Sequence, residues 1–155
     1  MKVLKRGEIQ EKYKWRVEDI FKDDDAFFAE LDGAAKETGI LSGYKGRLSD
    51  KTALLECLRA EEGLSKRLNL LGLYAHMKKD EDTKNVKYAA MYDRLIALSV
   101  KISSEASFIT PEISAFDDGL LTELIADKAF GDFDYMFKEI LRNKAHILSE
   151  KEEKL

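Results

Sequence analysis

The sequence predicts an all-α protein, an antiparallel helical bundle with a long central helical hairpin and a short extended N-terminal arm. The chain of 155 residues holds only one proline, Pro111. It is rich in Ala, Leu, Glu and Lys, a composition that favours helices over sandwiches and barrels, whose many turns need Gly and Pro. Apolar side chains also recur at helical spacing over long stretches, as one face of a helix requires.

The N-terminal residues 1–22 are expected to form an arm that packs on the bundle, and residues 23–148 the bundle itself. Tyr13, Trp15 and Val17 alternate with polar residues, which predicts an extended arm. Asp23, Asp24 and Asp25 follow, and negative charge is favoured at a helix N-terminus. The first helix should therefore begin there and run to about Thr38, with Gly39 as a stop.

The central hairpin is predicted from two long amphipathic stretches. The first runs from about Asp50 to Lys79, after a loop at 43–48, and its apolar stripe changes phase at Gly63. We expect a kink or a change of neighbour there. The second stretch, about 85–108, has apolar side chains at spacings of three and four residues: Tyr88, Met91, Leu95, Leu98, Ile102 and Ala106. The short polar connection between them predicts antiparallel packing.

Three further helices are expected in the C-terminal third. Thr110 is predicted as an N-cap with Pro111 at the first helical position, and two helices should follow at about 118–126 and 132–143. Ser149 and Glu152 have the spacing of a capping box. Since the sequence given ends at Leu155, too soon for a stable helix, we interpret 149–155 as the start of a truncated helix.

Composition disfavours several function classes. The net charge is −4 with no basic stripe, which argues against nucleic-acid binding because affinity there depends on neutralised phosphates. Neither a signal-peptide core nor a membrane-spanning run is apparent, so no membrane partner and a cytoplasmic location are expected. The single cysteine, Cys57, fits a reducing compartment and is predicted to be a packed helix position rather than a reactive thiol.

No catalytic, cofactor-binding or metal-binding residue can be assigned from motifs. The two histidines, His76 and His146, lack the H-E-x-x-H spacing of a helical zinc site. The acidic run from Asp80 fails as an EF-hand loop, because Lys84, Asn85 and Met91 stand where an oxygen ligand, Gly and Glu are needed. No glycine-rich phosphate loop is present.

Four stretches together resemble oligoendopeptidase F-type zinc metallopeptidases, which are relatives of thimet oligopeptidase. They occur in the family's order and at about its spacing: EKYKWRVEDIF (11–21), YKGRL (44–48), YAHMKKDEDTKN (74–85) and KAHILSEKEEKL (144–155). The resemblance implies a non-catalytic N-terminal helical domain that forms part of the wall of a substrate channel for short peptides. It implies zinc in a missing catalytic domain after 149–155, which would be a partner within the same polypeptide.

One alternative is a freestanding helical module for protein interaction or self-association, without enzymatic activity. Whether the chain belongs to an enzyme is uncertain on sequence alone, although the resemblance implies a metalloendopeptidase as the parent protein. If a catalytic domain is missing, an exposed apolar interdomain face should lie near the C-terminal segment, and dimerisation through it is possible.

Overall fold

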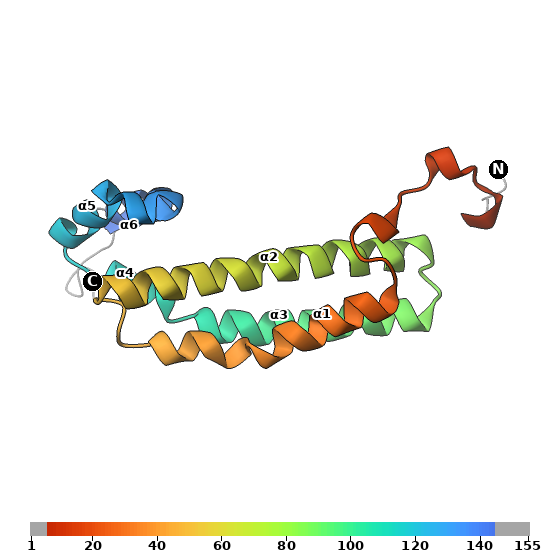
Figure 1. Ribbon diagram of the computed structural model, residues 1–155, viewed down its shortest axis with the longest axis horizontal. Helices are drawn as coiled ribbons and strands as arrows, with labels where there is room; N and C mark the ends of the chain where they lie inside the picture. The colour runs from red at the N-terminus through yellow and green to blue at the C-terminus, as the bar shows by residue number, and fades with distance from the viewer. Residues whose placement is uncertain (1–5, 145–155) are drawn as a thin grey trace, which may run out of the picture. The chain divides into compact units, whose positions relative to one another are not determined.

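The computed structural model describes residues 6–144, and this part of the chain is all-α, with no strand (Figure 1). These residues form two compact units. The first unit comprises the described residues up to Gly39 together with Glu62–Ser104, and the second comprises Ile40–Glu61 together with the described residues from Glu105 onward. The fold class is confirmed, whereas the predicted division at 22, 148 and 149 stays a prediction.

The longest helix, α2 (Lys51–Glu81), belongs to both units, because the boundary falls between Glu61 and Glu62. This boundary agrees with the second of the two alternatives predicted at Gly63, a kink or a change of neighbour. The helix runs through Gly63 without interruption, and the change of packing partner accounts for the phase shift in the apolar pattern.

The N-terminal arm consists of three short 3-10 helices: η1 (Arg6–Glu8), η2 (Glu11–Tyr13) and η3 (Val17–Asp19). The arm was predicted to be extended from the alternation of Tyr13, Trp15 and Val17, but two of these residues lie in 3-10 turns. Val17 is fully buried, whereas Tyr13 and Trp15 are 71% and 66% exposed. The hydrogen bond from the Ile20 N–H to the Val17 carbonyl closes a turn that begins at Val17.

Helix α1 (Asp24–Lys36) begins where the acidic run predicts it. The Asp23 carboxylate caps it by accepting a 2.8 Å hydrogen bond from the Ala26 N–H. Its buried side chains are Phe27, Leu31 and Ala34. The chain does not open into a loop at Gly39 but continues as a 3-10 helix, η4 (Thr38–Tyr44).

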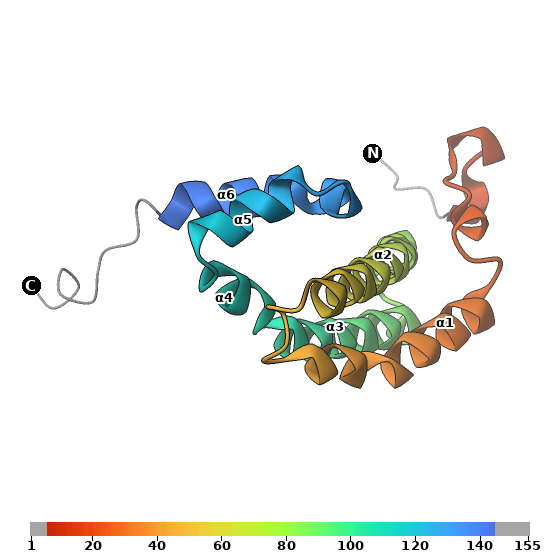
Figure 2. The ribbon, with the colours of Figure 1, turned by 60° about the vertical axis from the view of Figure 1, so that its left-hand side comes forward.

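The rest of the first unit is the helical hairpin of α2 and α3 (Val86–Ala106). Asn85 begins α3, since its side-chain oxygen accepts a hydrogen bond from the Lys87 N–H at 3.0 Å. Figures 1 and 2 show the two helices side by side, with α1 along them. Their buried side chains in this unit include Leu64, Leu71, Tyr74, Ala75, Met91, Leu95, Leu98 and Ile102.

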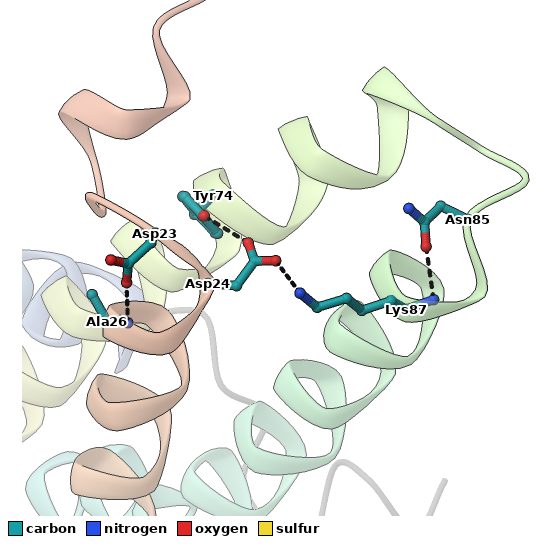
Figure 3. Close-up of polar contacts among 6 residues, drawn as sticks. All are labelled: Asp23, Asp24, Ala26, Tyr74, Asn85 and Lys87. Atoms are coloured by element: carbon teal, nitrogen blue, oxygen red, sulfur yellow. Dashed lines mark hydrogen bonds and ion pairs between the residues drawn. The ribbon is translucent and has the colours of Figure 1, made fainter.

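A partly buried carboxylate, Asp24, joins all three helices of the first unit (Figure 3). The Tyr74 hydroxyl of α2 donates to Asp24 at 2.8 Å, and Lys87 of α3 donates to its other oxygen. Burial alone would raise the pKa of Asp24, but the bonds from Lys87 and Tyr74 outweigh it and hold that pKa below its ordinary 3.8. Burial and the bond to Asp24 raise the pKa of Tyr74.

Arginines make further ties between α1 and the hairpin. Arg67 of α2 contacts the carboxylates of Glu30 and Glu37, the latter at 2.8 Å. Arg94 of α3 pairs with Asp32 at 3.0 Å. Gly33 makes room for Arg67, because a Cβ atom at Gly33 would lie 3.0 Å from the guanidinium.

The second unit contains α4 (Ile109–Ser114), α5 (Asp118–Ala126), η5 (Lys128–Phe133) and α6 (Asp134–Lys144). The predicted cap at Thr110 is wrong: the helix begins at Ile109 with Phe108 as N-cap, and Pro111 is the third helical residue. Proline is tolerated there because the first four N–H groups of a helix have no intrahelical acceptor.

The predicted loop at 43–48 is fastened by one carboxylate of α4. Glu112 accepts hydrogen bonds from the backbone N–H groups of Gly46, at 2.9 Å, and Leu48, at 2.8 Å. Gly46 has a φ of +78°, a conformation that favours glycine.

The Glu112 carboxylate also lies near Cys57, which is fully buried as predicted. Burial, with Glu112 and Glu61 in support, raises the pKa of the Cys57 thiol to about 11.

We expect Tyr74→Phe to destabilise the protein by about 1.5–3 kcal/mol at pH 7, the usual worth of a hydrogen bond to a charged group. The aromatic contacts with Phe21 and Phe27, at 5.5 and 5.4 Å between ring centroids, need no hydroxyl. The pKa of Asp24 is lower in the folded protein than in the unfolded chain. The ionised carboxylate therefore adds to the free energy of unfolding above pH 3.8, and this stabilisation is lost as the pH falls and Asp24 is protonated. Urea unfolding at pH 7 and pH 3 measures the difference. Tyr135→Phe is the control, since Tyr135 is 71% exposed, and equal effects at both sites would contradict the assignment.

We also expect Cys57 to resist thiol reagents at pH 8 in the folded protein, because only the exposed thiolate reacts. Labelling with a chromogenic disulfide should follow the rate of unfolding and become fast in denaturant. Rapid stoichiometric labelling without denaturant would show that the site is open.

Candidate functional site

Two adjoining hollows mark the surface of the first unit. One, of about 610 Å³, lies between α2 and α3 and is lined by Ser65, Leu68, Asn69, Gly72, Leu73, His76, Tyr92, Leu95, Ile96 and Ser99. The other, of about 650 Å³, lies between the arm and α2 and is lined by Lys14, Trp15, Arg16, Asp19, Leu73, His76, Met77 and Asp80. Because Leu73 and His76 line both, we treat the two as one feature, the hairpin groove.

The periodicity of α2 explains where this groove lies. Arg67 and Tyr74, which bond to α1, are seven residues apart and share one side of the helix. At about 100° per residue, Asn69 and His76 fall roughly 140–180° away from them around the helix axis. The hairpin groove therefore lies on the face of the hairpin turned away from α1.

The floor of the groove is apolar and partly open to water. Leu95 is buried, whereas Leu73 and Ile96 are 50% and 44% exposed. At the arm end, Trp15 and Met77 extend the apolar lining. Large exposed apolar side chains gathered in a hollow are typical of a binding surface.

Polar and charged groups border this apolar floor. Ser65, Asn69 and Ser99 lie along the hairpin, and the His76 Nε2 atom is 3.3 Å from the Asp80 carboxylate. At the arm end, Arg16 pairs with Asp19 at 3.2 Å. The Lys79 ammonium lies 4.4 Å from the centre of the Tyr92 ring. The groove can therefore offer hydrogen bonds and both signs of charge.

The hairpin groove does not have the donor set of a metal centre. Over residues 6–144, no group of three or more His, Cys, Asp or Glu side chains could hold a metal ion. His76 is 63% exposed and pairs only with Asp80 among the ion pairs described, and His146 lies outside the described residues. No described helix is both long and apolar enough to cross a membrane.

Sequence reasoning did not find this groove. The exposed apolar face was predicted near the C-terminal segment, where residues 145–155, including the Ser149–Glu152 capping box, lie outside the described part. In α6 the one large exposed apolar side chain among those described is Tyr135. The available signal was in α2 and α3, where Leu73 and Ile96 fall outside the stripe of buried residues.

Comparison with known proteins shows similarity along the whole chain. A family model described as Oligopeptidase F matches residues 112–155. The chain is 34% identical over 152 residues to oligopeptidase PepF of Bacillus subtilis. This alignment covers 97% of this chain and 23% of PepF. It is 32% identical to the group B oligopeptidase PepB of Streptococcus agalactiae, with 97% and 25% covered. It thus spans about a quarter of the length of these relatives.

The fold has a counterpart among solved structures. A crystal structure of a candidate peptidase from Chlamydophila abortus matches 99% of this chain and 26% of its own chain, with a TM-score of 0.84 and 22% identity. At this identity the match concerns the fold alone. The family assignment rests on sequence: the relatives at 34% and 32% identity and the matching family model show that the chain belongs to the oligoendopeptidase F family, as a counterpart of that family's N-terminal domain.

Proposed function

We propose that this chain acts as the non-catalytic N-terminal domain of a zinc-dependent oligopeptidase that hydrolyses short peptides. The observation that carries the proposal is the alignment of 97% of the chain with 23% of oligopeptidase PepF, at 34% identity. The catalytic part then lies in the three quarters of such a protein that this chain does not span, and it is the main partner of the domain.

In this proposal the zinc is bound by the catalytic part, which this chain does not span. The donors among residues 6–144 do not fit a zinc site, because catalytic zinc needs three protein ligands around one point. In this proposal the described residues do not bind the zinc. Their role is to hold a wall of the substrate channel in place, and the ties from α1 to the hairpin give that wall its rigidity. A cytoplasmic location stays a prediction, with which the unpaired Cys57 is compatible.

A second candidate function is a freestanding module for protein interaction or self-association. The observation that favours it is the set of exposed apolar side chains on the hairpin, among them Leu70, Leu73, Ile96 and Val100. Reading the gene past codon 155 separates the two functions. Continuation to an H-E-x-x-H helix supports the peptidase, and a stop codon after Leu155 supports the module.

The chain alone should neither cleave peptides nor retain zinc. We expect less than stoichiometric zinc by atomic absorption after treatment with a chelator and dialysis, and no cleavage of a quenched fluorescent peptide. Oligopeptidase PepF of Bacillus subtilis, handled identically, is the positive control. Stoichiometric zinc or steady cleavage by the chain would contradict the proposal.

The chain should also complement a relative that lacks the corresponding region. We expect co-production with PepF shortened by the region that matches this chain to restore peptide hydrolysis, because the missing wall would be supplied in trans. Co-purification and the rate of cleavage of the quenched peptide are the measurements. A shortened PepF that is stable but neither binds the chain nor gains activity would count against the proposed role.

A further inference from the structure

We propose that the hairpin groove binds an extended peptide segment and seats one apolar peptide side chain between Trp15, Leu73 and Met77. The inference rests on the proposed function and makes it specific: it assigns the residues of this chain that touch the peptide. It commits to an unfolded peptide chain as the occupant, rather than a helix or a second copy of the protein.

The spacing of polar groups along α2 fits an extended backbone. Asn69 and His76 both line the groove and are seven residues apart, which is about 10.5 Å along a helix. Three residues of an extended peptide span nearly the same distance, about 10 Å. A carboxamide both donates and accepts hydrogen bonds, and so does a neutral imidazole. The two side chains can therefore engage peptide groups three residues apart.

The length and lining of the groove set the size of the occupant. From Ser65 to Asp80 the groove residues of α2 extend over about 22 Å, which equals roughly seven residues of extended chain. Near one end, Trp15 and Met77 join the half-exposed Leu73 in an apolar hollow. Burying a Leu or Phe side chain there would remove apolar surface of both partners from water.

The charges at the arm end complement a peptide of mixed sequence. Lys14 and Arg16 provide positive charge, and Asp19 and Asp80 provide negative charge, all lining the same hollow. A free peptide carries an ammonium at one end and a carboxylate at the other, and both can find a counter-charge here. Arg16, Asp19 and Asp80 are exposed and therefore select weakly among sequences, whereas the Lys14 side chain is largely covered and pairs with Glu11.

The polar lining argues against a docked amphipathic helix. A helix would place an apolar ridge against Asn69 and could not satisfy the hydrogen bonds of its carboxamide, because the backbone groups of the helix are already paired. Covering a polar side chain without a partner costs free energy. An extended peptide has free N–H and C=O groups and avoids that cost.

The test is a titration of the chain with a Gly/Ser peptide of about seven residues that carries one central Leu. Trp15 is the single tryptophan, so its fluorescence reports on the hollow. We expect saturable binding, weakened by about three- to tenfold in Asn69→Ala, since one hydrogen bond is lost. Alanine is a good helix former, so this variant should fold. Leu73→Asp should abolish binding.

Leu70→Asp is the matched control, because Leu70 is 53% exposed on the same helix but does not line the groove. It should bind as the unaltered chain does. Replacing the central Leu of the peptide with Ser should also weaken binding. Circular dichroism verifies that each variant is folded.

The inference is overturned by absence of binding at millimolar peptide, by equal effects of Leu73→Asp and Leu70→Asp, or by tighter binding of an Ala-rich helical peptide with the same Leu. A concentration-dependent dimer that Leu73→Asp dissolves would overturn it as well and would identify a second copy as the occupant. The complementation assay distinguishes the two proposals. If Asn69→Ala and Leu73→Asp leave the KM for peptides unchanged in an active complex, the groove assignment fails while the proposed function stands.

Discussion

The arrangement of the first unit depends on carboxylates of α1 held by the helical hairpin. Asp24 accepts hydrogen bonds from α2 and α3 at once, and Arg67 bridges Glu30 of α1 and Glu37, the residue that follows this helix. Such contacts fix register and orientation, because each partner has only a few acceptable positions. By fixing α1 on one face of the hairpin, they leave the opposite face for the groove.

The pattern of helices was readable from the sequence because it depends on local chemistry. The Asp run marks the start of α1, the polar connection before Asn85 separates α2 from α3, and α5 has the bounds that the sequence predicts. The shift of apolar phase at Gly63 also carried real information, since the boundary between the two compact units lies beside it. Capping and periodicity act over a few residues, and they can be recognised in a single chain.

The features that escaped prediction depend on contacts between distant residues. Glu112 accepts hydrogen bonds from a loop more than sixty positions earlier in the sequence, and no local sequence pattern predicts that pairing. The cap at Thr110 was misplaced because a proline fits several positions of a first helical turn. The lining of the hairpin groove comes from α2, α3 and the arm, so it could not be predicted from any single stretch of the sequence.

The sharing of α2 between the two units has a consequence for how the protein is made. Each unit is assembled from two separated stretches of sequence, and the stretches alternate along the chain. Neither unit corresponds to a continuous piece that could be excised, exchanged or expressed by itself. During synthesis, the first unit lacks its last helix until residue 104 has emerged, by which point the opening stretch of the second unit has already been made. While residues 62–104 are being made, therefore, both units are incomplete on the nascent chain, and apolar surfaces of both stay exposed.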